Sequence, residues 1–141
     1  MIINKNILSY LKAYSYKVSK INRFITTAFC IENQLTVKNN TLIKQLLISE
    51  QDSCEQNALK EFCTLFKVNS QKFDFECLIE LFEFVISPSD KIVNGAVYTP
   101  KYIRNYIVNS CIGDNQNLND LTACDIACGC GGFLYEYAFK Y

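Results

Sequence analysis

Apolar residues recur three and four positions apart through the first ninety residues, which is the spacing of one face of an α-helix. Neither glycine nor proline interrupts this region before Pro88. The pattern therefore predicts a helical domain over residues 1–90, whose helices turn their apolar stripes toward a shared core. Five stripes carry the prediction: residues 7–14, 21–29, 42–47, 58–66 and 75–86.

Polar residues before two of these stripes indicate where helices begin. Ser53 precedes the fourth stripe and, with Gln56 three residues later, has the form of a capping box. Asp74 is expected to cap the fifth helix, which should stop at Ser87–Pro88 because the residue before proline avoids helical geometry. That last stripe consists of Phe75, Leu78, Ile79, Phe82 and Ile86.

The composition favours a folded protein and excludes several classes of function. Half of the residues are hydrophobic, which excludes disorder, and no apolar run reaches the roughly 18 residues of a membrane-spanning helix. The chain has no histidine, so Ser-His-Asp and Cys-His catalysis and histidine-ligated metal sites are excluded. Fourteen basic and fourteen acidic residues cancel, so no bulk electrostatic attraction to nucleic acid is visible.

The first thirty residues carry five basic side chains and no acidic one. A basic amphipathic start is also typical of mitochondrial transit peptides. This start has a single arginine and continues into further helices without a break, so a solvated helix face, which could lie beside DNA phosphates, is the favoured interpretation. The basic residues are Lys5, Lys12, Lys17, Lys20 and Arg23.

Eight cysteines raise the questions of disulfides and of zinc. No cleavable signal opens the chain, so we expect reduced thiols in a cytoplasmic protein. Cys124, Cys128 and Cys130 lie close together, but structural zinc uses paired knuckles and a second pair is missing from the sequence. No metal site is therefore predicted.

All five glycines lie beyond residue 90, and we place the domain boundary at about that position. Thr99 is a residue type favoured at an N-cap, and Pro100 is favoured at the first helical position. A helix should therefore start there and end near Gly113. Its apolar side is expected to consist of Ile103, Ile107 and Cys111.

A buried strand, a glycine turn and a helix are predicted after a polar loop over residues 114–120. Leu121–Ile126 is short and compatible with a strand. Ala127–Gly132 follows with three glycines, and helical spacing returns from Phe133 onward. Closely spaced glycines let the backbone approach a ligand, and the next helix offers its free N–H groups to an anion.

Three ligand-binding motifs compete for this turn. A Walker A loop requires a Gly-Lys-Ser/Thr sequence, and no lysine is present here. The dinucleotide fingerprint requires a third glycine at the position of Leu134. A turn that binds S-adenosylmethionine (SAM), with the form D-x-x-x-G-x-G, is matched by Asp125, Gly129 and Gly131.

This turn and a second element upstream resemble two motifs of a known family, the adenine-N6 DNA methyltransferases of type I and type IIG restriction-modification systems. The order and separation of the two elements match the family's motif X and motif I. The resemblance covers about residues 92–141 and implies that an α/β Rossmann-like methyltransferase domain, with an incomplete sheet, occupies residues 91–141. The matching elements are Gly95-x-x-Tyr98-Thr99-Pro100 and Asp125-x-Ala127-Cys128-Gly129-x-Gly131-Gly132-Phe133-Leu134.

The resemblance implies SAM as the cofactor and double-stranded DNA as the substrate of the full-length enzyme. Motif X would line the methionine end of SAM, and Asp125 would orient that end opposite its ammonium group. The turn would wrap the methionine and ribose, with Phe133 packing it down. The implied cofactor-binding residues are Tyr98, Thr99, Pro100, Asp125, Ala127, Cys128, Gly129, Cys130, Gly131 and Gly132.

The sequence also departs from the family. Ile126 replaces the usual proline after the aspartate, and Cys130 stands where serine, threonine or another small residue is usual. The catalytic Asn/Asp/Ser-Pro-Pro-Tyr/Phe motif is absent, as is the acid that would hold the ribose hydroxyls. We therefore predict no catalytic residue in this chain. We expect the N-terminal part of a longer methyltransferase, one that neither methylates DNA nor binds SAM tightly by itself.

Two alternatives remain. The chain could be a helical interaction subunit of a split methyltransferase or restriction-modification complex, with a specificity or complementing subunit as its partner. The methyl acceptor could also be RNA or protein, although the resemblance of Tyr98-Thr99-Pro100 favours DNA. No membrane partner is expected.

Overall fold

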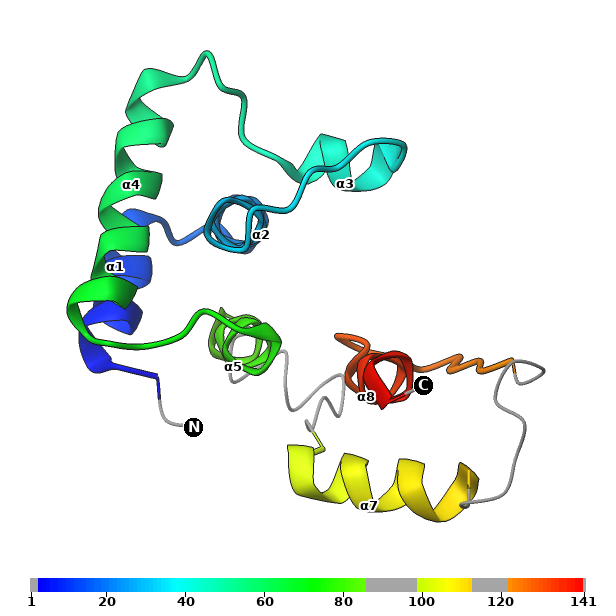
Figure 1. The fold of residues 1–141 in the computed structure, drawn as a ribbon. Coiled ribbons are helices and arrows are strands. Elements are labelled where there is room, and N and C mark those ends of the chain that lie inside the picture. Colours follow the sequence, from blue (N-terminus) through cyan, green and yellow to red (C-terminus); the bar gives the residue numbers. More distant parts are fainter. Residues whose placement is uncertain (1–2, 86–98, 113–121, 141) are drawn as a thin grey trace. The chain divides into compact units, whose positions relative to one another are not determined.

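A computed structural model describes residues 3–85, 99–112 and 122–140 of the chain. Within these ranges the protein is mainly helical and contains no strand (Figure 1). Its contacts divide the chain into two compact units, Met1–Ser87 and Pro88–Tyr141. The domain boundary expected near residue 90 and the helix stop expected at Ser87–Pro88 lie outside the described residues.

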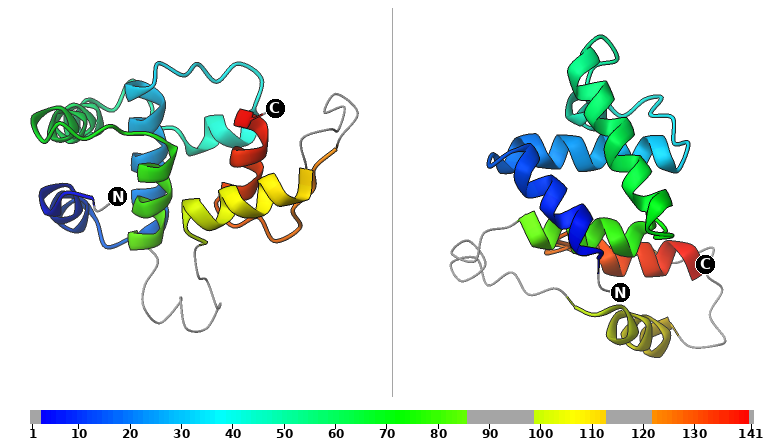
Figure 2. Two further views of the ribbon diagram at one scale, coloured as in Figure 1. Left: turned by 60° about the horizontal axis from the view of Figure 1, so that its bottom comes forward. Right: turned by 90° about the vertical axis from the view of Figure 1, so that its left-hand side faces the viewer.

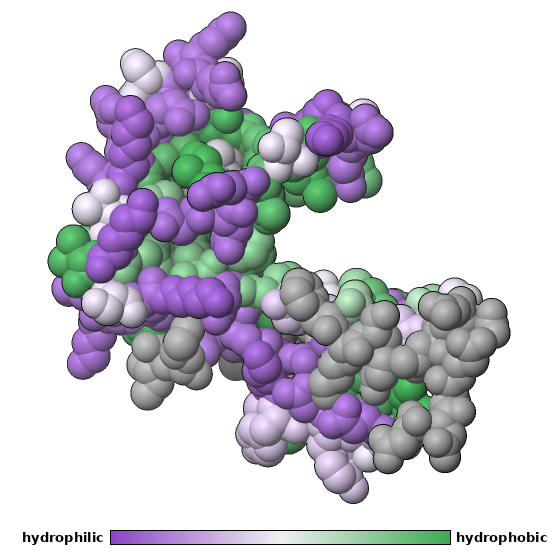
Figure 3. Space-filling model, in the orientation of Figure 1, coloured by the Kyte–Doolittle hydropathy of each residue, from purple (hydrophilic) through white to green (hydrophobic). Residues whose placement is uncertain are grey.

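The first unit is helical, as its apolar stripes predict. Helix α2 packs against α3, α4 and α5, and α1 packs against α4 (Figure 2). Hydrophilic side chains cover much of the visible surface of these helices, with hydrophobic ones between them (Figure 3). No helix in the part of the chain that the structure describes is long and apolar enough to cross a membrane. The helices of the first unit are α1 Lys5–Tyr14, α2 Val18–Glu32, α3 Thr41–Leu46, α4 Ser53–Val68 and α5 Phe75–Val85.

The core of the first unit is built around the ring of Phe62 in α4. This side chain is fully buried, and its ring centroid lies 5.2 Å from that of Phe24, 5.3 Å from Phe66 and 5.7 Å from Tyr10. Phe73, in the loop after α4, stacks on Phe66 at 4.3 Å. Ring contacts of this kind stabilise a core beyond the area that they bury. The stripes predicted for α1, α2 and α4 are confirmed by the buried residues Ile7, Leu11, Ile21, Phe24, Ile25, Ala28, Leu59, Phe62, Cys63 and Phe66.

Two predicted stripes are wrong in part. Helix α3 has no buried residue, and Leu42 is 73% exposed, because a helix of six residues makes less than two turns against its neighbour. Helix α5 buries Cys77, Ile79 and Leu81, whereas Leu78 and Phe82 of the expected stripe are only partly buried, although they pack against the core. Apolar residues occupy most positions of α5, and spacing alone therefore does not decide which side faces the core.

Acidic side chains cap two helices of the first unit. Asp74 caps α5 as expected, because its Oδ1 accepts the backbone N–H three residues further on at 3.0 Å. The cap of α4 is Asp52 rather than the predicted Ser53, and its Oδ1 accepts from the N–H of Glu55 at 3.1 Å. Gln56 donates to a carbonyl in the preceding loop instead of closing a capping box. A carboxylate is favoured at this position because it also interacts with the positive end of the helix dipole.

A polar network links α1, α2 and α4 beside the core. Glu55 accepts a hydrogen bond from the Tyr14 hydroxyl, and its Oε1 lies 2.9 Å from Nζ of Lys20. Burial acts to raise the pKa of Glu55, but the hydrogen bonds from Tyr14 and Lys20 outweigh it and hold this pKa below its usual value of 4.5. Burial and the hydrogen bond to Glu55 raise the pKa of Tyr14 well above its usual range.

The eight cysteines are free thiols with different surroundings. Cys63 and Cys77 are buried in the core, and burial raises the pKa of these thiols to about 11 and about 12. Since the thiolate is the reactive form, both are expected to be inert toward alkylating reagents at neutral pH. Cys54 is exposed at the start of α4.

Candidate functional site

The described part of the second unit contains two helices that pack against each other, α7 Lys101–Ile112 and α8 Gly132–Lys140. The helix predicted from Thr99–Pro100 is confirmed, but it starts one residue later than expected. The carbonyl of Pro100 accepts from the N–H groups of Ile103 at 3.0 Å and Arg104 at 3.1 Å, so the proline precedes the first helical residue. Tyr98 lies outside the described residues.

Helix α7 buries a different face from the one that its isoleucines suggest. Its buried residues are Arg104, Val108 and Ile112, which are spaced four apart. Ile107 is 39% exposed and Cys111 is exposed, so the predicted apolar side is wrong. Each buried residue lies one position after the residue predicted to be buried. The cause is the arginine, whose charged group has its partners inside the unit rather than in solvent.

Arg104 is buried between the segment before α7 and helix α8. Its Nη1 donates to the carbonyl oxygen of Thr99 at 2.7 Å, and its Nη2 lies 3.5 Å from Oε1 of Glu136. The two charged side chains are 2% and 7% exposed. Buried charges persist where they are paired and hydrogen-bonded, as these are. Sequence analysis missed this pair, and the one signal for it was the four-residue spacing of Arg104 from Val108.

The strand predicted over Leu121–Ile126 does not form in its described part. Residues 122–125 have no regular secondary structure, and no backbone hydrogen bond joins residues 122–124 to another described residue. Ile126 is 98% exposed in a turn rather than buried. A strand needs a neighbouring strand for its N–H and C=O groups, and the described residues provide none.

The glycine turn and the helix after it form as predicted. Oδ1 of Asp125 accepts from the N–H of Ala127 at 3.0 Å, and the carbonyl of Cys128 accepts from Gly131 at 2.7 Å. Gly129 and Gly131 have φ angles of +53° and +75°, in the left-handed region that favours glycine. A Cβ atom on either glycine would meet nothing within 4 Å. Glycine is therefore favoured here by the backbone conformation and not by a lack of space.

The N-terminus of α8 opens at this turn. The carbonyl of Gly131 accepts the first helical hydrogen bond, from Tyr135 at 2.9 Å. The N–H groups of Gly132, Phe133 and Leu134 precede that bond and donate to no other described backbone group. Three donors at the positive end of a helix dipole are suited to an anionic group.

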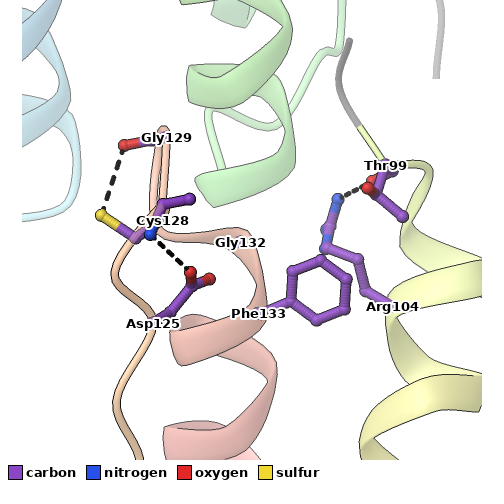
Figure 4. Close-up of a pocket in the computed structure, with 8 residues that line it drawn as sticks. Thr99, Arg104, Asp125, Cys128, Gly129, Gly132 and Phe133 are labelled. Carbon is purple, nitrogen blue, oxygen red and sulfur yellow. Dashed lines mark hydrogen bonds between the residues drawn. The ribbon is translucent and has the colours of Figure 1, made fainter. Parts of the chain in front are cut away.

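A pocket of about 200 Å³ lies beside the turn, and motif residues from both elements line it (Figure 4). Arg104 and Phe133 complete the wall, and the ring of Phe133 points toward the Arg104 side in Figure 4. Of the described residues predicted to bind the cofactor, Pro100, Cys130 and Gly131 do not line the pocket. The lining residues are Thr99, Arg104, Asp125, Ala127, Cys128, Gly129, Gly132 and Phe133.

The pocket fits the amino-acid end of SAM better than the whole cofactor. Pockets that enclose drug-sized ligands have volumes of about 300–1,000 Å³, which is larger than this one. The Asp125 carboxylate is an acceptor that suits an ammonium group, and the free N–H groups of α8 are donors that suit a carboxylate. These two charged groups are the ones that the methionine end of SAM carries.

Comparisons of the chain with protein-family models, with curated proteins and with solved structures found no match. In the described ranges, no three acidic or cysteine side chains gather closely enough to hold a metal ion. The function is therefore proposed from the two motifs and the pocket that they line.

Proposed function

We propose that the second unit forms the methionine-binding part of a SAM site, and that the chain serves methyl transfer to adenine N6 in double-stranded DNA. One observation carries this proposal. Thr99, from the element that resembles motif X, and Asp125, from the element that resembles motif I, line the same pocket. A helix start and a glycine turn with purely structural roles have no need to share a cavity.

Each group at the pocket has a role that its chemistry allows. Asp125 would accept a hydrogen bond from the methionine ammonium group, and the first N–H groups of α8 would bind the methionine carboxylate. The left-handed conformations of Gly129 and Gly131 form the turn from which α8 starts, and Gly129 lines the pocket. When bound, SAM supplies a methyl group on a positively charged sulfur, which is the electrophile of the reaction.

Methyl transfer also needs groups that hold the target adenine. A flipped base must be held with its amino group in line with the methyl group. In the family that the chain resembles, the Asn/Asp/Ser-Pro-Pro-Tyr/Phe motif does this, whereas the prolines here are Pro88 and Pro100 alone. We therefore assign the chain a part in cofactor binding and assign the catalytic groups to residues outside this sequence.

Cofactor binding is expected to protect Cys128 from alkylation. Cys128 is exposed and lines the pocket, whereas Cys54 is exposed in the first unit and does not. S-adenosylhomocysteine, which lacks the transferable methyl group, should slow the reaction of Cys128 with iodoacetamide. The rate at Cys54 should stay constant and provides an internal reference. Half-protection is expected near roughly 1 mM ligand, a binding free energy of about −4 kcal/mol, because only one end of the ligand is held.

Two variants make this experiment specific. Asp125→Ala should abolish the protection, because it removes the acceptor for the ammonium group. Glu50→Gln removes one exposed acidic charge from the first unit and should leave the protection unchanged. Peptide mass spectrometry gives the alkylation rate at each cysteine. Equal rates at Cys128 with and without millimolar ligand would refute the proposed function.

A second candidate, a subunit that completes a split methyltransferase, is favoured by a separate observation. An apolar groove of about 420 Å³ runs along the extended segment 122–125 and is lined from α7 and α8 by residues such as Val108, Ile112 and Leu134. A polypeptide that supplies a β-strand would pair with this backbone and cover the groove.

Co-expression separates the two candidates. A polypeptide with a SAM-dependent methyltransferase sheet and the Pro-Pro-Tyr/Phe motif should co-purify with the chain, and plasmid adenine methylation should require both. Methylation by the purified 141-residue chain alone would contradict both candidates, because neither assigns it catalytic groups.

A further inference from the structure

We propose that Arg104 is a positioning residue that holds the two motif walls of the pocket at a fixed separation. One wall is Thr99, just before α7, and the other is α8, which starts directly from the glycine turn. Arg104 is bonded to both, through Nη1 to the Thr99 carbonyl and through Nη2 to Glu136. This role rests on the proposed function, because it matters only if the pocket binds the methionine end of SAM.

The geometry of α8 connects Glu136 to the turn. Glu136 lies four residues after Gly132, so the two residues occupy the same face of the helix one turn apart. Gly132 lines the pocket and Glu136 is 5% exposed behind it. A displacement of Glu136 along or around the helix would therefore move the first N–H groups of α8, which are the proposed carboxylate donors.

The chemistry of the pair favours positioning over simple stabilisation. Val108 and Ile112 continue the buried face of α7, so an apolar residue at position 104 would complete an ordinary core stripe. Burying an ion pair in place of apolar side chains does not in general stabilise a protein. What the guanidinium adds is a rigid planar fork that donates in two directions at once, and an ammonium group does not reproduce it.

A charge exchange separates the two roles. The double variant R104E/E136R keeps an ion pair between α7 and α8, but it places a carboxylate instead of a donor beside the Thr99 carbonyl. We expect it to retain the helix content and melting temperature of the wild-type chain and to lose protection of Cys128 by S-adenosylhomocysteine. If the pair acts only in folding, the exchange restores both properties, and that result would overturn the inference.

Single variants give the size of the effect. R104M should raise the ligand concentration that gives half-protection by about tenfold. This is the weakening of binding expected for the loss of a hydrogen bond from a charged donor. R104K keeps the charge and the apolar stem, so it covers the case in which R104M does not fold, and it should weaken binding in the same direction. Circular dichroism of each variant verifies the fold before alkylation is measured.

The outcomes for the two proposals can be told apart. Protection of Cys128 in the wild-type chain together with unchanged protection in R104K and R104M would overturn the role of Arg104 and leave the proposed function in place. No protection in the wild-type chain would overturn the proposed function, and the positioning role would fall with it.

Discussion

Replacing Phe62 with alanine is expected to lower the free energy of unfolding of the first unit by about 3–5 kcal/mol. The ring is fully buried and contacts rings from α1, α2, α4 and the loop that follows α4. Its removal leaves a cavity whose walls come from four separate segments, so no single side chain can move to fill it. Urea unfolding followed by far-ultraviolet circular dichroism measures the loss.

The matched control is Tyr16→Ala. Tyr16 is also aromatic, but it is 89% exposed in the turn between α1 and α2, so its removal should change the unfolding free energy by less than about 0.5 kcal/mol. Similar losses for the two variants would mean that Phe62 does not occupy the centre of the core.

Replacing Glu55 with glutamine is expected to cost about 1.5–3 kcal/mol at neutral pH, the value typical of hydrogen bonds to a charged group. The carboxylate accepts from Tyr14 and pairs with Lys20, and these contacts join three helices. The folded-state pKa of Glu55 lies below 4.5, so its contribution is fully present above that value. It is lost as the pH falls through the folded-state pKa, and the wild-type chain should lose its advantage over the variant there.

Stability should also fall at alkaline pH, because the pKa values of Tyr10 and Tyr14 are raised, whereas that of Glu55 is lowered. Burial, followed by the hydrogen bond to Glu61, raises the pKa of Tyr10 from 10.0 to about 12, and the pKa of Tyr14 is raised in the same direction. A raised pKa gives a contribution that is complete below pH 10 and is lost as the pH rises through the folded-state value. Unfolding measured from pH 3 to 11 should therefore show a decline at each end.

The acid decline is the diagnostic one. Glu55→Gln should flatten it and reduce only part of the decline between pH 10 and 11, because burial still raises the pKa of both tyrosines although the charge of Glu55 no longer adds to it. An acid decline of the same size in the variant would show that other carboxylates dominate and that Glu55 is not a structural link.

The helices of the first unit could be predicted from the sequence because their buried residues repeat with a clear period. Leu59 and Phe62, for example, are buried and are separated by Lys60 and Glu61, which are exposed and mark the solvent side. The glycine turn could be predicted for a different reason. Positive φ angles, as at positions 129 and 131, are conformations that residues other than glycine rarely adopt. Glycine at both positions therefore predicts the turn directly.

The remaining errors have physical causes that spacing does not contain. Helix α5 is apolar on most sides, so packing and not periodicity selects the face that Cys77 and Leu81 bury. The buried side of α7 depends on Arg104, whose partner Glu136 lies in another helix and is not evident from the local sequence. The strand predicted over residues 121–126 would require a neighbouring strand, and local composition does not indicate whether one is present.

Residues 122–124, whose backbone bonds to no other described residue, also have a consequence for the chain in concentrated solution. Groups that can accept a partner strand can equally accept the same segment of another copy, and the exposed side chain of Ile126 adds an apolar contact to that pairing. Self-association then competes with any correct partner and increases with protein concentration.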